Sequence, residues 1–472
     1  MINPPLDLWP RNPRYLRFRG LPTFLLTSAE HYGAVFNLDV DYHAYLGELT
    51  RCRFNYTRTA SGTFVEHEST IEGSGWENTQ APRPLRYLAP WARTDIDGYH
   101  HGGTKFDLGE ISGAYLDRLI DFVYQAALRG IIVELTLFTA QYSPGHWLMS
   151  PMHPANNIND LAMIDHQSVY HLDNGGLLHH QLAFVRTIVD ALINYDNVII
   201  ELINEPYFSG VERAWIDTVL DAIEHRFNHH RRRLLVAWNY ANVDGRITGM
   251  SPGIDLFTFH YANPPSVIEQ NFDLAIPVVY DETGYDGVDD SQYRSHAWEF
   301  MLAGGAGFNH LDYSFAPSGD DTGTRTLPGN ASGGGGRRLR DQLTILRDFL
   351  ADLPFANTAP VTMTARSGTD TRTIRGLADP GKAYAFYLNG IAVDSVELMA
   401  VAGDYVVRWV DPLTGYATSS VQTITADGAV RLQVPARRRE VACSILQLQP
   451  ETQREVGDFD FVEAAKSTTF SS

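Results

Sequence analysis

The fold is decided by the nine residues VIIELINEP, which occupy positions 198–206 of the 472-residue chain. The run is apolar and rich in β-branched side chains, which is typical of a strand that is buried on both faces. It ends at Asn204-Glu205-Pro206, so a carboxylate stands where the strand stops. The functional groups of a (β/α)8 barrel lie at the carboxyl ends of its strands. The stretch therefore predicts a barrel strand that carries a catalytic glutamate, Glu205.

Strand-like and helix-like segments alternate from about residue 23 to residue 353, which predicts parallel β/α architecture. Seven further strand-like runs accompany the one at 198–203. They are residues 23–28, 54–58, 131–138, 234–239, 256–261, 276–282 and 306–312. Eight strand–helix pairs suit a (β/α)8 TIM barrel with insertions. The alternative is a doubly wound open sheet, but no glycine-rich phosphate turn follows the first strand.

The predicted barrel takes residues 1–353, and two further regions follow it. Between 354 and 450 only short strand-like runs remain, separated by turns rich in proline and glycine, which predicts a small antiparallel β-sandwich. Residues 451–472 are polar and acidic and are expected to form a disordered tail. Within the barrel, the long segments at about 59–112 and 139–174 are expected to be ordered loops after the second and third strands.

Composition excludes several classes of partner. The formal net charge of −19 argues against nucleic acid and anionic membranes, because both carry the same sign of charge. Cys52 and Cys443 lie far apart and give no disulfide framework. No apolar run approaches the roughly 20 residues of a membrane span, and residues 1–19 lack the apolar core of a signal peptide. The chain is expected to be cytoplasmic, or secreted or periplasmic with its signal peptide removed; a homo-oligomer stays open.

Two glutamates follow strands that face each other across a barrel mouth. Glu205 ends the fourth strand and Glu282 ends the seventh. Cleavage of a glycosidic bond needs a carboxylic acid that protonates the leaving oxygen and a carboxylate on the other side of the sugar ring. We expect Glu282 to be ionised and held by Arg58 and Tyr261. Its charge is then expected to raise the pKa of Glu205 and keep that group protonated.

Other polar and aromatic side chains also follow the predicted strands or lie in the long loops. The expected substrate-binding residues are Glu30, His31, Arg58, His146, Trp147, Asn204, Trp238, His260, Tyr261, Asp312 and Tyr313. Several have an ordinary structural role open to them, such as a surface salt bridge for Arg58 or core packing for Trp238. Trp76 and Trp91, in the first long loop, either shape outer subsites or anchor that loop.

Paired histidines occur at 100–101, 179–180 and 229–230 and suggest a metal site at first sight. None shows the i, i+4 helical spacing with a glutamate, or the cysteine-rich spacing, that zinc sites use. The sequence therefore predicts no metal site and no cofactor.

Together these residues resemble the clan A glycoside hydrolases, in particular the cellulase-like family 5 group. The resemblance rests on Asn204-Glu205-Pro206 on the fourth strand, Glu282 on the seventh, Arg58 on the second and His260-Tyr261 on the sixth. It implies an acid/base role for Glu205 and a nucleophile role for Glu282. It also implies that Asn204 contacts the sugar 2-hydroxyl and that Arg58 and Tyr261 hold the nucleophile.

The C-terminal region and the eighth strand extend the resemblance and also limit it. Residues 384–388 (YAFYL) and 407–415 (VRWVDPLTG) are similar to the collagen-binding-type β-sandwich that follows many such bacterial barrels, and 311–315 (LDYSF) is typical of that barrel subgroup. The family usually places a tryptophan at the end of strand eight, where this chain has His310-Leu311-Asp312-Tyr313. This departure weakens a glucan assignment and favours an unusual glycone, such as a furanose, a deoxy sugar or an acidic sugar.

The expected function is a retaining glycoside hydrolase that acts on a plant or microbial glycan or oligosaccharide. The two long loops favour a walled pocket and exo action. Two alternatives stay open, namely a non-catalytic carbohydrate-binding barrel and a metal-dependent hydrolase on the same fold.

Overall fold

The computed structural model describes residues 3–66, 78, 80–317, 320–329, 331, 333–390, 393–435 and 440–448. The predicted tail at 451–472 and Trp76 lie outside these residues. In the part of the chain that is described, no helix is long and apolar enough to cross a membrane.

Eight parallel strands form the barrel, which confirms the predicted fold class. In their order around the sheet they are β4 (Leu25–Ala29), β13 (Gly307–Leu311), β12 (Val278–Glu282), β11 (Leu256–His260), β10 (Leu235–Asn242), β9 (Val198–Asn204), β8 (Ile132–Thr139) and β5 (Tyr56–Ala60). Strand β9 is buried from Val198 to Ile203, as its apolar run requires. Its neighbours β8 and β10 pair with it in parallel register.

The seam between β4 and β5 is bridged by the side chain of Asn55. Its Nδ2 donates to the carbonyl oxygen of Phe24 at 2.7 Å, and its Oδ1 accepts from the amide of Leu26 at 3.1 Å. We expect Asn55→Ala to lower the free energy of unfolding by about 1–3 kcal/mol, because the carbonyl oxygen of Phe24 and the amide of Leu26 lose these partners. Urea unfolding measures this change. Asn55→Asp should be destabilised at least as much as Asn55→Ala, because its second carboxylate oxygen would face the carbonyl oxygen of Phe24.

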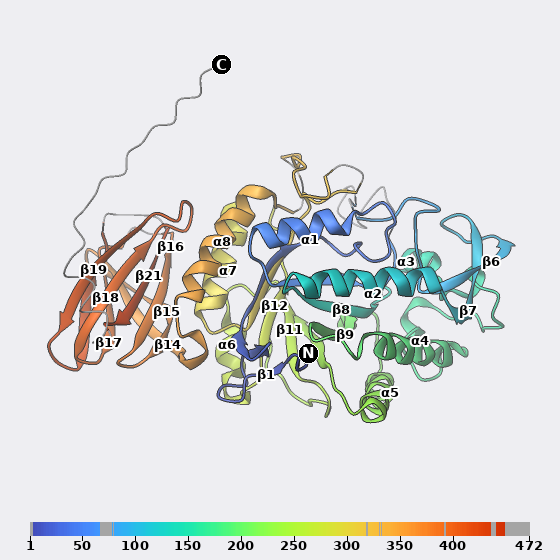
Figure 1. The fold of residues 1–472 in the computed structure, drawn as a ribbon, viewed down its shortest axis with the longest axis horizontal. Coiled ribbons are helices and arrows are strands. Elements are labelled where there is room, and N and C mark those ends of the chain that lie inside the picture. The colour runs from blue at the N-terminus through green and yellow to red at the C-terminus, as the bar shows by residue number, and fades with distance from the viewer. Residues whose placement is uncertain are drawn as a thin grey trace, which may run out of the picture.

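Helices cover the outside of the barrel in Figure 1. They are α1 (Tyr42–Arg51), α2 (Gly113–Leu128), α4 (Leu177–Leu192), α5 (Arg213–His230), α6 (Ser266–Asn271), α7 (Asp290–Leu302) and α8 (Arg337–Ala351). Helix α2 begins where the Ser112 side chain accepts from the amide of Tyr115, and it buries an apolar stripe that includes Leu119 and Phe122. The predicted strand–helix alternation fails once, because residues 243–255 join β10 to β11 without a helix.

The N-terminal residues close the floor of the barrel, which the sequence patterns did not reveal. A small antiparallel sheet of β1 (Asp7–Leu8), β2 (Leu16–Phe18) and β3 (Leu21–Thr23) precedes the first barrel strand. Its side chains Leu16 and Phe18 share an apolar cluster with residues at the amino ends of the barrel strands. The opposite end of the barrel is therefore the end that stays open to a ligand.

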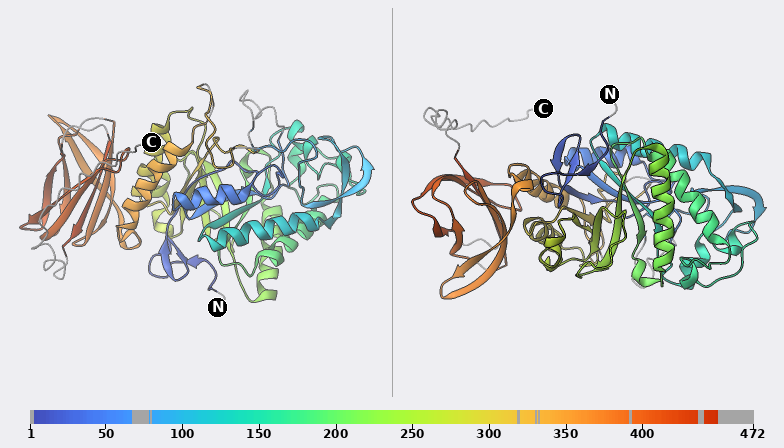
Figure 2. Two further views of the ribbon diagram at one scale, coloured as in Figure 1. Left: turned by 45° about the horizontal axis from the view of Figure 1, so that its top comes forward. Right: turned by 90° about the horizontal axis from the view of Figure 1, so that it is seen from below.

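The loops after β5 and β8 are ordered over their described parts. The first contains the hairpin β6 (Trp91–Asp97) and β7 (Thr104–Ile111), and the second contains the short helix α3 (Pro144–Met149). The isolated bridge between Phe106 and Asn157 ties the two loops together. Both views in Figure 2 place the hairpin at one end of the molecule and the C-terminal sheet at the other.

The C-terminal region is one antiparallel sheet that encloses its own apolar core. In order it comprises β19 (Ala417–Ile424), β18 (Gly403–Val410), β21 (Glu440–Gln447), β16 (Ala383–Asn389), β15 (Asp370–Asp379), β14 (Ala359–Ser367), β17 (Ser395–Ala400) and β20 (Gly428–Gln433). It packs beside α7 and α8 (Figure 1). The guanidinium of Arg294 on α7 donates to both carboxylate oxygens of Glu440, at 2.6 and 2.9 Å, and Trp298 stacks on Tyr387. This buried contact joins the sheet firmly to the barrel.

Candidate active site

Glu205 and Tyr261 stand at the ends of β9 and β11 in left-handed backbone conformations. Their φ angles are 50° and 52°, which are uncommon for residues with a side chain. The amide of Glu205 donates to Oδ1 of Asn239 at 3.0 Å, and the amide of Tyr261 donates to the carbonyl oxygen of Glu282 at 3.0 Å. Neighbouring strands therefore hold both turns, and strained backbone of this kind persists only where its surroundings enforce it.

Strand β12 ends in a bulge that supplies two inward-facing carboxylates. In its register with β11, Phe259 pairs with Tyr280 while His260 pairs with Glu282, so Asp281 is the extra residue. Side chains alternate between the two faces of a regular strand, and a bulge breaks that alternation. As a result Asp281 contacts Arg58 inside the barrel although Glu282, the next residue, also faces the barrel mouth.

Arg58 on β5 is the centre of the charge network below the barrel mouth. Its guanidinium binds both carboxylate oxygens of Glu201, at 2.8 and 2.9 Å. It also donates to Oε2 of Glu282 at 3.1 Å and to Oδ1 of Asn204 at 2.5 Å, and its Nε lies 3.2 Å from Asp281. The predicted contact between Arg58 and Glu282 is confirmed. A planar guanidinium suits this role because it presents several donors in fixed directions.

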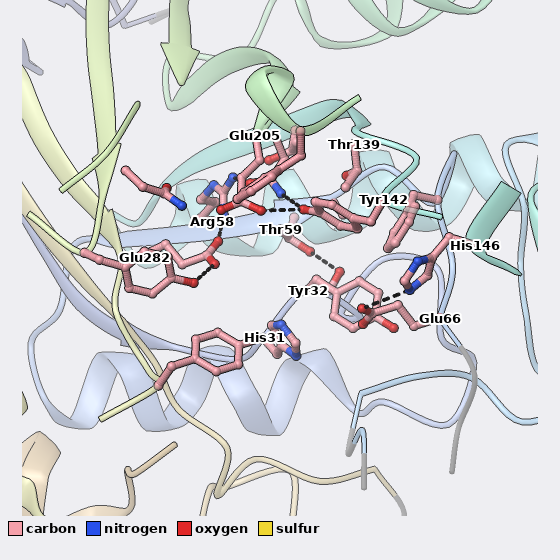
Figure 3. Close-up of a pocket in the computed structure, with 18 of the residues that line it drawn as sticks. His31, Tyr32, Arg58, Thr59, Glu66, Thr139, Tyr142, His146, Glu205 and Glu282 are labelled. Atoms are coloured by element: carbon pink, nitrogen blue, oxygen red, sulfur yellow. Dashed lines mark hydrogen bonds and ion pairs between the residues drawn. The ribbon is translucent and has the colours of Figure 1, made fainter. Parts of the chain in front are cut away.

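Glu205 accepts hydrogen bonds from two sides. The phenol of Tyr142 donates to Oε2 at 2.7 Å, and Nδ1 of His260 lies 3.0 Å from Oε1. Glu282 accepts from the phenol of Tyr261 at 2.7 Å, which confirms the second contact expected for it. The hydrogen bonds to the two glutamates come from different donors, but Nδ1 of His260 also lies 3.5 Å from Oε2 of Glu282. Figure 3 shows the two glutamate side chains converging near Arg58.

The electrostatics of Glu205 differ from the expectation drawn from the sequence. Burial lowers the pKa of His260, but the charges of Glu282 and Asp281 and the hydrogen bond with Glu205 outweigh burial and raise it to about 9. Burial raises the pKa of Glu205, but the hydrogen bond and charge of His260, then Tyr142 and Arg58, outweigh burial and lower it. The expectation that Glu282 keeps Glu205 protonated in the free protein is therefore wrong. The nearby imidazolium reverses the sign of the shift.

A pocket of about 690 Å³ opens above the two glutamates (Figure 3). Its wall brings together side chains from the barrel strands and both long loops. The lining residues are His31, Tyr32, Arg58, Thr59, Ala60, Phe64, Glu66, Thr136, Thr139, Tyr142, Ser143, His146, Asn204, Glu205, Phe208, Asn242, Tyr261, Glu282 and Tyr285. Five of the predicted substrate-binding residues lie in this wall, namely His31, Arg58, His146, Asn204 and Tyr261. His260 is fully buried just beneath it.

Three residues at strand ends that were expected to bind substrate contact other parts of the protein instead. Glu30 uses both carboxylate oxygens to accept the backbone amides of Gly33 and Ala34. Asp312 is buried in an ion pair with Arg340 on α8. Tyr313 packs on His31, behind the pocket wall. Strand-end placement is therefore correct for all three, but the structure does not bring them to the ligand space.

The predicted tryptophans also lie away from the pocket. Trp147 donates from its indole nitrogen to the carbonyl oxygen of Ile164 at 3.1 Å and so anchors its loop. Trp238 lines a separate depression, together with Pro206 and Tyr207. Trp91 is buried against Phe184. Among the residues that the structure describes, the aromatic side chains in the pocket wall are tyrosine, histidine and phenylalanine.

Several residues of the site were not singled out from the sequence. Tyr142 lies in the loop after β8, where no spacing distinguishes it from its aromatic neighbours. Glu201 and Asp281 occupy buried strand positions, and a charged residue inside an apolar strand was the available signal for both. Glu66 comes from the loop after β5 and faces His146, with Oε1 and Nε2 at 3.8 Å.

In the described part of the chain, two groups of buried side chains lie close enough to hold a cation. They are Glu205, His260 and Glu282, and Glu134, Glu201 and Asp281; within each group the ligand atoms lie within 4.8 Å of one another. Positive charge is already present in both places, because Arg58 binds Glu201 and Asp281 and the raised pKa of His260 makes it an imidazolium. Each group therefore already contacts one cationic side chain, Arg58 or His260.

No protein-family model matches the sequence, and no curated protein matches it. Solved structures do match. A Bacteroides vulgatus ATCC 8482 protein, itself proposed to be a glycoside hydrolase, aligns with a TM-score of 0.68 and 13% identity over 94% of this chain and 83% of that one. A family 5 glycoside hydrolase from the same strain aligns with a TM-score of 0.57 and 14% identity over 94% of each chain.

The chain has the fold of family 5 glycoside hydrolases. The exo-β-1,4-mannosidase Op5Man5 from Opitutaceae bacterium strain TAV5 also aligns, with a TM-score of 0.50 and 15% identity over 75% of this chain and 64% of that one. The two Bacteroides matches span the barrel and the C-terminal sheet together. The resemblance inferred from Asn204-Glu205-Pro206 and Glu282 therefore agrees with the fold that these proteins share.

Proposed function

We propose that the protein is a retaining glycoside hydrolase in which Glu282 is the nucleophile and Glu205 is the acid/base. The observation that carries the proposal is the approach of two carboxylates, on β9 and β12, to within 4.8 Å across the pocket floor. Retaining glycosidases hold their carboxyl groups about 5–5.5 Å apart, whereas inverting enzymes leave a wider gap for a water molecule.

In the first step a carboxylate oxygen of Glu282 attacks the anomeric carbon of the sugar, and the bond from that carbon to the leaving oxygen breaks. Glu205 gives its proton to the leaving oxygen. Arg58 and Tyr261 fix the direction of Glu282 through one hydrogen bond to each of its oxygens. Preorganised donors of this kind lower the cost of aligning a nucleophile.

In the second step water enters, and Glu205 removes its proton while the oxygen attacks the same carbon. The bond to Glu282 breaks, and the carboxylate returns to Arg58 and Tyr261. Two displacements at one carbon restore its original configuration. Asn204 bridges the two halves of the site, because it accepts from Arg58 and donates to Tyr142.

The charges of the pocket favour a neutral glycone. The lining includes the carboxylates of Glu66, Glu205 and Glu282, whereas Arg58 is already engaged by carboxylates below the pocket. An anionic sugar would meet like charge in a partly desolvated space. Of the unusual glycones considered from the sequence, a neutral one fits this wall and an acidic one does not.

A panel of aryl glycosides tests the proposal. It should include β-mannosides, because one structural neighbour is an exo-β-1,4-mannosidase, together with furanosides and hexuronides. We expect hydrolysis of at least one neutral glycoside and none of the hexuronides, with NMR showing that the first-formed product keeps the anomeric configuration of the substrate. An inverted product would contradict the paired-glutamate mechanism.

Glu205→Ala should separate the two steps. An aryl glycoside whose leaving group is an acidic phenol needs little protonation, so its first step should remain fast in the variant. The glycosyl-enzyme should then accumulate, which appears as a burst of released phenol. A glycoside with an alkyl leaving group should lose about 10²–10⁴-fold in kcat/KM, because it depends on the acid. Equal losses for both substrates would argue against Glu205 as the acid.

A metal-dependent hydrolase is the second candidate, and the grouping of Glu205, His260 and Glu282 is the observation that favours it. Dialysis against a chelator followed by an assay with and without added divalent ions separates the two. We expect activity to be unchanged by the chelator. Loss of activity that zinc or manganese restores would favour the second candidate.

A further inference from the structure

A buried chain of three side chains runs from the barrel interior to the acid/base. It comprises Asp281 at the bulge of β12, His260 at the end of β11 and Glu205 at the end of β9. Nε2 of His260 lies 3.6 Å from Oδ1 of Asp281, and Nδ1 lies 3.0 Å from Oε1 of Glu205. Asp281 and His260 are completely buried, so water does not screen their charges.

Asp281 and His260 lack competing hydrogen-bond partners on the sides that face each other. Among the described residues, Nε2 of His260 and both carboxylate oxygens of Asp281 have no hydrogen-bond partner. The other cation that contacts Asp281 among the described residues is Arg58, whose Nε lies 3.2 Å from the carboxylate, and the carboxylates of Glu134 and Glu201 also lie nearby. A buried carboxylate usually accepts several hydrogen bonds. Asp281 therefore acts on its surroundings mainly through its charge, and His260 is one of the two cations within its reach.

We propose that His260 stores the proton used by Glu205 and that Asp281 is the positioning residue that keeps that proton on the imidazole. This inference rests on the proposed glycosidase function, in which Glu205 must deliver a proton. It extends that function because the free protein then holds its acid as a Glu205–His260 pair, with Glu205 ionised and His260 charged.

The proton balance follows from the same contacts. When the leaving oxygen of a substrate approaches Glu205, the proton on Nδ1 of His260 moves to Oε1 of Glu205 and Glu205 protonates the leaving oxygen. His260 is then neutral, and Glu282 has lost its charge by bonding to the sugar. In the second step Glu205 takes a proton from water and returns it to Nδ1, while Glu282 regains its charge. At the end of each cycle His260 is charged again, and Glu205 and Glu282 are ionised again.

The groups around His260 all bear on this assignment. Glu205 faces it from β9, Asp281 and Glu282 face it from β12, and Arg58 on β5 contacts the same two β12 carboxylates. On β10 the register partner of His260 is Asn242, which carries no charge. Three carboxylates therefore contact the imidazole directly, whereas Arg58 acts on it only from beyond them.

The charge of Asp281 depends on pH. Burial raises its pKa to about 7, against the lowering effects of Arg58 and His260. Above pH 7 Asp281 is mostly ionised and opposes loss of the proton from His260, whose pKa is raised to about 9. Neutralising Asp281 should therefore lower the pKa of His260 by one to three units, as loss of a close opposite charge does.

Histidine NMR on the unliganded full-length protein tests the inference without any substrate. Imidazole ¹⁵N and ¹³C shifts report protonation, and a His260→Asn variant identifies the His260 signals. In the wild type we expect His260 to be charged at pH 8. His31 and His310 serve as internal references, since burial lowers the pKa of each to about 4 and both should be neutral.

Two matched variants identify the role of Asp281. Asp281→Asn should lower the titration midpoint of His260 by at least one pH unit. Glu134→Gln removes another buried carboxylate, one that accepts from Tyr56 and does not contact His260, and should leave the midpoint within a few tenths of a unit. Equal shifts in both variants, or a neutral His260 in the wild type at pH 8, would overturn the inference.

Enzyme kinetics provide the second readout. In Asp281→Asn the alkaline limb of the kcat/KM profile should move to lower pH by the same amount as the His260 midpoint, while Glu134→Gln keeps the wild-type limb. If the wild-type protein hydrolyses no glycoside, the proposed function is contradicted, but the NMR test of His260 still applies. If the wild type hydrolyses a glycoside but the alkaline limb of Asp281→Asn does not move, the inference is contradicted and the proposed function is not.

Discussion

Glu282→Ala should abolish turnover of glycosides and should become active again when azide is supplied. In the proposed mechanism this carboxylate forms the covalent intermediate, so kcat is expected to fall by more than about 10⁴-fold, as it does when a hydrolase loses its nucleophile. Azide is small enough to occupy the space of the lost carboxylate and attack the anomeric carbon from that face. A single displacement then gives a glycosyl azide of inverted configuration, which NMR of the product identifies.

A control separates this result from damage to the fold. Glu282 is one of several carboxylates around Arg58, and Glu201 and Asp281 remain to pair with it in the variant. The melting temperature should therefore stay close to the wild-type value. Glu224→Ala, which removes a surface glutamate paired with Arg233, should keep full activity. Wild-type turnover in Glu282→Ala, or a glycosyl azide of retained configuration, would contradict the nucleophile assignment.

The sequence was sufficient to place the two glutamates but not to set their charges. The strand count puts Glu205 on the fourth strand and Glu282 on the seventh, and parallel strands bring those ends to one mouth. The pKa of Glu205 depends on His260, which lies 55 positions further along the chain and is charged only because carboxylates from two other strands surround it. Such long-range contacts leave no local pattern in the sequence.

The strand-end rule also predicted more ligand contacts than the structure contains. Glu30 and Asp312 do follow barrel strands, but Glu30 accepts the amides of the turn that comes next and Asp312 binds a helix arginine. Position along a strand sets how high a side chain lies in the barrel. Whether a local turn or a neighbouring helix takes up that side chain depends on geometry that the apolar pattern does not encode.

The bulge in β12 shows a further limit of reading alternation from sequence. Strict alternation directs Asp281 away from the barrel interior if Glu282 faces its mouth. The extra residue at the bulge lets both point inward, so a third carboxylate joins Glu134 and Glu201 below the pocket. The adjacent pair Asp281-Glu282 was visible in the sequence, but the bulge that turns Asp281 toward Arg58 arises from the register of β12 against β11.

Arg58→Met should destabilise the protein strongly, and more so as the pH rises. Arg58 is buried and contacts Glu201, Asp281 and Glu282, so its removal leaves buried carboxylates without their main cation. Removing one partner of a buried ion pair typically costs about 3–5 kcal/mol. Urea unfolding at several pH values measures this loss. Arg83→Met, which removes an exposed arginine paired with Asp39, should change the free energy of unfolding by less than about 0.5 kcal/mol.

The pH dependence of Arg58→Met distinguishes lost charge from lost packing. Burial already raises the pKa of Asp281 to about 7 in the wild type, although Arg58 lowers it, so the variant should raise that pKa further. A carboxyl whose folded pKa exceeds its unfolded value destabilises the fold progressively as pH rises between the two values. The stability difference between wild type and variant should therefore be larger at pH 8 than at pH 5. If the stability difference between wild type and variant does not change with pH, Arg58 stabilises the fold through its packing. The protonation of the carboxylates below the pocket would then not depend on Arg58.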